Sequence, residues 1–312
     1  MMTLMPAALL AAPILIVLAL APGAIGADPA PPADRPGEST AVVKPAAAAG
    51  KPGEIATASD LLQQLENSGK GLKTLQSSLR RTRFFSELEG GDTHVWTGRL
   101  IYDASTQTPP PVQTLRRFRI DFDTVARGSV QSNAKTSWIF DGEWLTEVDH
   151  TAKQVHKRQI MPPGQRVDPL ALGEGTFPLP IGQQRDKILE RFDAELLPPD
   201  RFEYFQGGRL PEPLKETYQL RLIPKAGRDE GRRLAEARLW YRKSDLLPRM
   251  AWTSEPDGSR NEYYLWGMKT NEALAEETFD VKPQAGWTVQ VDTYKADKPA
   301  ETPAPASDTS KP

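Results

Sequence analysis

The apolar residues near the start of the chain's structured part recur at helical spacing. A leucine series begins just after Ser59 and Asp60, either of which can cap a helix, and it passes two glycines, Gly69 and Gly71. We therefore expect a helix over residues 61–79 that is broken or kinked at the glycines. The leucines of this series are Leu61, Leu62, Leu65, Leu72, Leu75 and Leu79.

Beyond this segment the apolar period becomes two, which is typical of strands with one polar face. The clearest run places Phe118, Ile120 and Phe122 on one face and charged residues on the other. The pair Asp141-Gly142 follows another run and indicates a hairpin turn. Because most runs have a polar face, they predict an antiparallel sheet. The runs cover residues 96–102, 117–123, 138–140, 144–148, 218–222, 237–241, 248–252 and 262–266.

These elements predict a mainly β protein with some α-helix (α+β). We expect a half-open, curved antiparallel β-barrel of about ten to eleven strands, covered by a few short helices. Further helices are expected at residues 168–172 and 183–192. So few helices leave an apolar inner face incompletely filled, which favours an internal ligand cavity; a solid core remains the alternative. The expected cavity residues are Phe84, Leu100, Tyr102, Phe118, Ile120, Phe122, Trp138, Phe140, Trp144, Leu220, Tyr241, Met250, Trp252, Tyr264 and Trp266.

A long apolar segment punctuated by glycine and proline, residues 168–180, separates the two groups of strands. Its glycines give it hinge freedom, so we interpret it as a lid over the cavity, with an ordinary crossover loop as the alternative. The lid residues are Leu170, Leu172, Phe177 and Leu179.

Composition divides the 312-residue chain further. Residues 1–26 combine an apolar run with a small-residue cleavage site, which predicts a signal peptide for export to the periplasm. If it is not cleaved, it would tether the protein to the inner membrane. Residues 27–57 and 296–312 are rich in Ala, Pro and Lys and are expected to be disordered, which leaves one domain at residues 58–295.

The order of these signals resembles the LolA family of outer-membrane lipoprotein carriers and the fold shared with LolB, LppX and the amino-terminal domain of RseB. The resemblance rests on the leucine helix and on the runs Arg117–Phe122, Trp138–Leu145, Tyr218–Pro224, Leu247–Met250 and Thr278–Pro283. It implies a periplasmic carrier that shields the acyl chains of lipids or lipoproteins, with a membrane-bound donor or acceptor protein as partner. The alternative is a sensor or regulatory module like RseB, bound to a protein partner. An arginine that holds the lid closed in LolA has its nearest candidates here in Arg99 and Arg116.

Other chemistry receives little support. The chain lacks cysteine and carries a net charge of −2, so disulfides, thiol catalysis and nucleic-acid binding are not expected. Because no nucleophile–base, phosphate-loop or dinucleotide motif appears, we expect no enzyme, no catalytic residue and no cofactor. His150 and His156 are too widely spaced for a metal site. Arg80, Arg81 and Arg83 form a basic patch that would meet anionic headgroups or lie on a solvated face. We expect a monomer.

Overall fold

The computed structural model describes residues 54–86, 90–106, 114–160, 172, 181–182, 184–205 and 208–294. The chain divides into two units, Met1–Ala46 and Ala47–Pro312, and every described residue belongs to the second. The predicted signal peptide, nearly all of the predicted linker and the tail at 296–312 lie outside the described residues.

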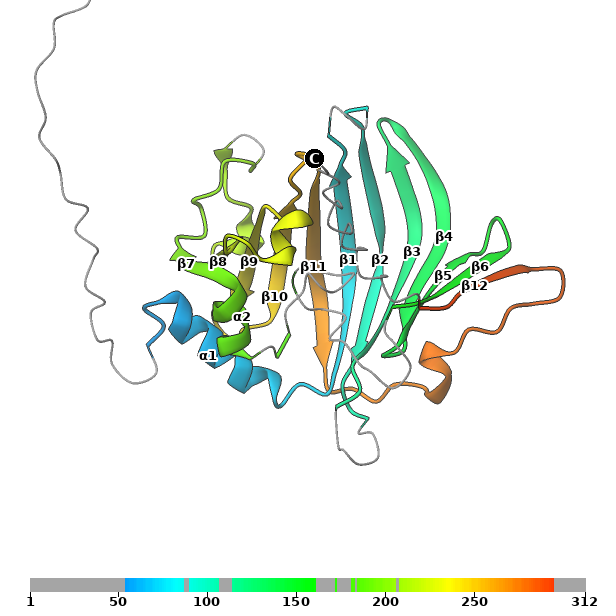
Figure 1. Cartoon of the computed structure of the whole chain (residues 1–312), viewed down its shortest axis with the longest axis horizontal. Coiled ribbons are helices and arrows are strands. Elements are labelled where there is room, and N and C mark those ends of the chain that lie inside the picture. Colours follow the sequence, from blue (N-terminus) through cyan, green and yellow to red (C-terminus); the bar gives the residue numbers. More distant parts are fainter. Residues whose placement is uncertain are drawn as a thin grey trace, which may run out of the picture. The chain divides into compact units, whose positions relative to one another are not determined.

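Within these described ranges, twelve strands form a single curved sheet that remains open (Figure 1). Neighbours pair antiparallel except for β12, which runs parallel to β6. The predicted class, mainly β with antiparallel pairing, is confirmed, although the sheet does not close into a barrel. The strand order is β12-β6-β5-β4-β3-β2-β1-β11-β10-β9-β8-β7. The bounds are β1 Thr74–Phe84, β2 Thr93–Asp103, β3 Arg117–Arg127, β4 Val130–Phe140, β5 Trp144–Asp149, β6 Gln154–Gln159, β7 Phe192–Leu197, β8 Thr217–Pro224, β9 Glu236–Arg242, β10 Pro248–Ser254, β11 Arg260–Thr270 and β12 Thr288–Asp292.

Two α-helices accompany the sheet in the described part of the chain. Helix α1 spans Ala58–Gly69, and α2 spans Arg185–Arg191, close to the helix expected at 183–192. A capping box at Thr57 and Asp60 starts α1: each side chain accepts a hydrogen bond from the other residue's backbone N–H, at 3.2 and 2.9 Å. Short 3₁₀ helices are η3 Glu212–Leu214, η4 Asp229–Arg232 and η5 Glu276–Phe279. The helix expected at 168–172 lies outside the described residues except for Leu172.

The first predicted helix is too long. Helix α1 ends at Gly69, and the chain enters β1 at Thr74, so Leu75 and Leu79 lie in a strand. Their spacing of four fits alternate strand positions as well as a helical turn. Pairing decides the outcome, because β1 is hydrogen-bonded to β2 on one side and β11 on the other. Tertiary contacts here override a local pattern that is compatible with both structures.

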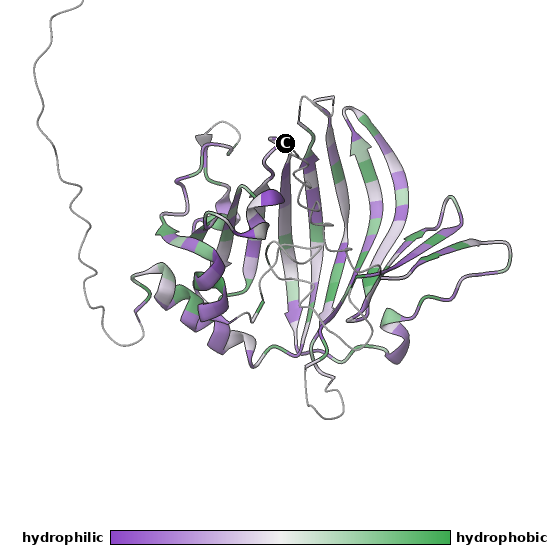
Figure 2. Cartoon of the chain, viewed as in Figure 1, coloured by the Kyte–Doolittle hydropathy of each residue, from purple (hydrophilic) through white to green (hydrophobic). Residues whose placement is uncertain are grey.

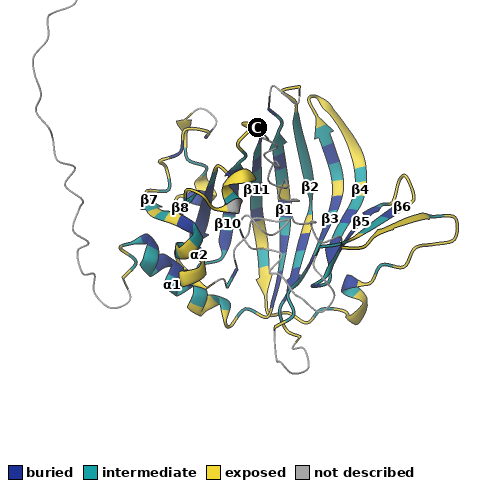
Figure 3. Cartoon of the chain, in the orientation of Figure 1, coloured by how far each residue is buried: buried dark blue, intermediate teal, exposed yellow. Residues whose placement is uncertain are grey.

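The sheet has two distinct faces. We call the face that packs against α1 the inner face; it carries the main apolar cluster, which includes Leu61, Leu79, Leu100 and Ile120, all fully buried. Apolar and polar colours alternate along the strands in Figure 2, as the period of two predicts. The opposite face, which we call the outer face, carries two smaller apolar clusters. Burial is most continuous along β9 and β10, whereas every residue of β12 is exposed (Figure 3).

Local irregularities bend the strands, and one of them depends on a glycine. The pairing of β2 with β3 shifts register between Thr97 and Gly98. A Cβ at Gly98 would collide with the carbonyl oxygen of Asp121 and would lie 2.9 Å from the Cα of Phe122. The two backbones can approach this closely only because Gly98 has no side chain.

We therefore expect Gly98→Ala to lower the free energy of unfolding by about 2–4 kcal/mol, because β3 must move to admit the methyl group. Urea denaturation followed by tryptophan fluorescence measures the change. The matched control is Gly231→Ala, whose added Cβ would lie 3.8 Å from the nearest atom, on Pro224, and should change stability by no more than about 0.5 kcal/mol. Equal stabilities for the two variants would contradict this account of the bend.

Candidate functional site

Nine of the fifteen residues expected to line a cavity lie on the inner face. Cross-strand pairs place them there in register: Leu100 faces Ile120, and Tyr102 faces Phe118. Most of them are fully buried, so this face is covered and does not form an open trough. The nine are Leu100, Tyr102, Phe118, Ile120, Phe122, Trp138, Phe140, Leu220 and Tyr241.

The other six lie on the outer face. Met250 pairs with Trp240 and with Tyr264, and together with Trp252 they pack against a segment that includes Phe202. Strands β9 and β10 are therefore buried on both faces, and in such strands alternation cannot tell which side a residue faces. Trp266 is 42% exposed. The six are Phe84, Trp144, Met250, Trp252, Tyr264 and Trp266.

A cavity of about 300 Å³ adjoins the inner face where the end of α1 meets the turn between β9 and β10. Its lining is mostly apolar, with Asp245 and Asn271 among the polar contributors. Fully buried Tyr241 forms part of the wall, and burial raises the pKa of its hydroxyl, which stays protonated. The main apolar lining residues are Leu65, Leu72, Ile181, Tyr241, Leu246, Leu247 and Pro248.

Two backbone features shape this cavity. The end of α1 touches the segment 181–182, and a Cβ on Gly69 would collide with the Cα of Gly182. Gly182 itself has a φ of +64°, which favours glycine. Across the cavity, Leu246 has a φ of +58°, a left-handed conformation that costs a leucine roughly 1–2 kcal/mol. Such strain is typical of functional positions, so Leu246 is a candidate contact residue.

Sequence reasoning found only Tyr241 of the main lining residues, since the cavity is built from the ends of elements and not from strand faces. The sequence features that could have pointed to this cavity are Gly69 and Gly182, two glycines that lie far apart in the chain, each next to apolar residues. Nothing in the sequence indicates the left-handed conformation of Leu246.

The segment expected to form a lid is described only in part. Leu170, Phe177 and Leu179 lie outside the described residues, whereas Leu172 is fully buried in the inner-face cluster. Of the two arginines proposed to hold the lid, Arg116 donates a hydrogen bond from Nη2 to the carbonyl oxygen of Gly182 at 3.0 Å. Arg99 is exposed.

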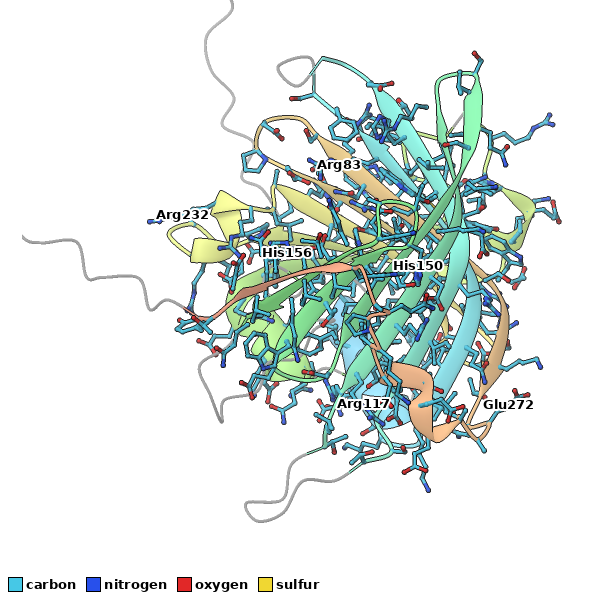
Figure 4. The ribbon with its side chains drawn as sticks, turned by 90° about the vertical axis from the view of Figure 1, so that its right-hand side faces the viewer. Arg83, Arg117, His150, His156, Arg232 and Glu272 are labelled. Carbon is cyan, nitrogen blue, oxygen red and sulfur yellow. The ribbon has the colours of Figure 1, made fainter. Side chains whose placement is uncertain are left out.

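His150 and His156 lie beside the segment that carries β12 (Figure 4). His156 pairs with Asp292 of β12 at 2.6 Å, and His150 stacks edge-on against Trp287 with its Nε2 3.2 Å from Ser137 Oγ. In the described part of the chain, no group of three or more acidic or histidine side chains could hold a metal ion. His150 and His156 instead contact Trp287 and Asp292, near the end of the described residues.

A polar cavity of about 430 Å³ lies beside Asp103 and Arg117. Asp103 is 1% exposed, accepts a 3.0 Å hydrogen bond from Arg117 Nε, and accepts another from the Ser105 N–H at 2.9 Å. Burial opposes ionisation of this carboxyl, but the hydrogen bonds from Ser105 and Arg117 outweigh it, so the pKa of Asp103 lies below its usual value. The pair joins the ends of β2 and β3, so we regard its role as structural.

No family model matches the sequence, and no curated protein matches it. Similar solved structures include an uncharacterized conserved protein from Thermus thermophilus, with a TM-score of 0.40, 15% identity, and coverage of 76% of this chain and 99% of that chain. The MucA/MucB complex of Pseudomonas aeruginosa gives a TM-score of 0.39 and 14% identity, and the match covers 72% of this chain and 61% of that chain. A LolA superfamily protein from Nitrosomonas europaea gives a TM-score of 0.32 and 11% identity, and the match covers 73% of this chain and 99% of that chain.

Among the described residues, no helix has the length and hydrophobicity needed to cross a membrane.

Because the pKa of Asp103 is lowered in the folded state, its ionised form adds stability above pH 3.8, and that stability is lost as the pH falls through the folded-state pKa. We expect Asp103→Asn to lower the free energy of unfolding by about 2–3 kcal/mol at neutral pH. Urea denaturation between pH 2 and 7 should show that the gap between wild type and variant narrows in acid. Asp280→Asn, at an exposed ion pair with Lys282, is the control and should show no such gap. If the difference in free energy of unfolding between wild type and Asp103→Asn stays constant across this pH range, the charge of Asp103 does not contribute to stability.

Proposed function

We propose that this protein is a periplasmic carrier that binds an acyl chain of a lipid or lipoprotein and keeps it away from water. The cavity under α1 carries the proposal, because its lining is mostly apolar and it opens next to the buried inner-face cluster. Its volume of about 300 Å³ lies at the lower end of the range for small-molecule sites, which suits one narrow chain better than a bulky headgroup.

Hydrophobic burial supplies enough driving force without covalent chemistry. Each methylene group removed from water contributes about 0.8 kcal/mol, so ten of them contribute roughly 8 kcal/mol before the costs of association. That total corresponds to an affinity no tighter than about micromolar from the chain alone. Such binding is reversible, as a carrier requires for transfer to another membrane or protein.

The contact between α1 and the segment 181–182 supports reversible access. It includes a close backbone contact between Gly69 and Gly182, and Arg116 donates a hydrogen bond to the Gly182 carbonyl oxygen. Because Ile181 and Gly182 line the cavity, a shift of this segment relative to α1 would widen it. A membrane-bound donor or acceptor protein would be the partner in transfer.

A second candidate function is that of a protein-binding module. Its support is β12, which is an edge strand among the described residues, where it pairs with β6; Val289 and Val291 on it are 49% and 53% exposed. Such an edge can accept a strand from another protein. Co-purification of an envelope membrane protein that Val289→Pro abolishes, combined with the absence of any bound lipid, would favour this candidate over the carrier.

Two measurements on the purified protein test the carrier. Native mass spectrometry should show lipid-sized adducts, and the neutral apolar dye N-phenylnaphthylamine should gain fluorescence with the protein and lose it when palmitate is added. A protein that carries no adduct and binds no dye is not an acyl-chain carrier.

The cavity itself is tested by Leu246→Asn. Asparagine tolerates a positive φ, so the fold should keep its stability within about 1 kcal/mol, whereas the apolar contact is lost. We expect dye and palmitate affinity to fall about fivefold. The matched control is Lys153→Asn, at an exposed turn residue with a φ of +54° far from the cavity lining, which should bind as wild type does. If Leu246→Asn binds the dye and palmitate as wild type does, this cavity is not the binding site.

A further inference from the structure

Arg81 lies on the inner face of β1 and is surrounded by aromatic rings. Its guanidinium carbon lies 5.0 Å from the ring centre of Trp96 on β2, 4.9 Å from that of Trp138 on β4 and 5.7 Å from that of Tyr263 on β11. The neighbouring Arg80 points to the outer face, where it pairs with Glu262 at 3.5 Å. The basic patch predicted from sequence is therefore divided between the two faces.

The hydrogen-bonding capacity of Arg81 is largely unused within the described part of the chain. A guanidinium has five N–H donors, and here Nη2 donates to Asn261 Oδ1 at 3.0 Å. The Nε atom is buried and has no hydrogen-bond partner. No carboxylate among the described residues forms an ion pair with Arg81, although desolvated cations are ordinarily paired.

The carboxylate that shares Asn261 with Arg81 is engaged elsewhere. Glu255 accepts hydrogen bonds from Arg83 Nη1 at 3.2 Å and from Asn261 Nδ2 at 3.0 Å. Asn261 thus stands between Arg81 and Glu255 and presents only a neutral oxygen to the guanidinium. The arrangement leaves one positive charge on the inner face without a counter-charge from these residues.

We propose that Arg81 binds the anionic headgroup, a carboxylate or a phosphate, of an amphiphile whose chain is shielded by the protein. This inference rests on the proposed carrier function and specifies its ligand class. Guanidinium groups bind carboxylate and phosphate oxygens through paired N–H donors, and the surrounding rings hold the group in place without supplying an acceptor. Aromatic walls also pack against the first carbons of an attached chain.

Arg81 and the cavity lie towards opposite ends of β1. Thr270, which lines the cavity, pairs with Leu75, and Arg81 lies six positions further along the same strand. At about 3.3 Å per residue the separation is roughly 20 Å, which is longer than the roughly 15 Å that one leaflet's acyl chains span in a bilayer. Leu75, Leu79 and Leu100 between the two places are fully buried, so a chain whose headgroup binds Arg81 reaches towards the cavity only when the cover of the inner face moves.

Three ligands with the same sixteen-carbon chain test the proposal in displacement of N-phenylnaphthylamine: palmitate, hexadecyl phosphate and hexadecanol. Wild type should bind one or both anionic ligands about tenfold or more tighter than the alcohol, and the stronger of the two identifies the headgroup class. Arg81→Gln should remove this preference while leaving hexadecanol binding unchanged. Arg80→Gln, on the outer face of the same strand, is the matched control and should keep the preference.

Several outcomes would overturn the inference. Equal affinity of wild type for all three ligands excludes a headgroup site, and this arm needs no variant. An equal loss for all three ligands in Arg81→Gln assigns the residue a structural role. If Arg81→Gln does not fold, Arg81→Lys keeps the charge but loses the paired donors, and it should retain only part of the preference. If wild type binds none of the ligands, hexadecanol included, the carrier function itself fails.

Discussion

The curvature of the sheet is the constraint on which the inner face depends. Adjacent strands lie about 4.8 Å apart, so in a flat sheet β1 and β4 would be separated by roughly 14 Å. The guanidinium of Arg81 on β1 lies 4.9 Å from the ring centre of Trp138 on β4, because two long side chains and the bend of the sheet together close that separation. Register shifts at Gln76/Ser78, Thr97/Gly98 and Phe122/Thr124 supply the bends, and the close backbone contact at Gly98 allows one of them.

The half of the sheet that contains β9 and β10 is packed on both faces. Strands β9 and β10 are buried on both sides, by the inner-face cluster and by the segment that carries Phe202, so this half is a fixed support. The cavity opens at the border of that support, beside the turn containing Leu246 and against the end of α1. A cavity at such a border can change volume through small shifts of α1 and the segment 181–182 without breaking strand pairs.

The sequence predicts the strands well where one face of the strand is polar and the other apolar. The run Phe118, Ile120, Phe122 became β3 in the expected orientation, because charged residues occupy its other face. Prediction failed where two structures share a spacing, as with Leu75 and Leu79, and where both faces are apolar, as with Met250. The cavity was not predictable, because Leu65, Ile181 and Leu246 meet only through tertiary packing. The three arginines were found as a patch, but only strand register separates Arg81 from Arg80.

The amide of Asn261 explains how a positive charge can be both held and available. A carboxylate at that position would form a strong ion pair with Arg81, and an incoming anion would have to compete with it. The amide oxygen instead accepts one weaker hydrogen bond from Arg81, and the amide nitrogen donates to Glu255, whose charge is offset by Arg83. The rings of Trp96, Trp138 and Tyr263 compensate part of the lost hydration through their π faces, which act on a cation but cannot replace an anion's directional bonds. Arg81 is thus held against the sheet by neutral groups and keeps N–H donors with which an anionic ligand of the proposed kind would bond.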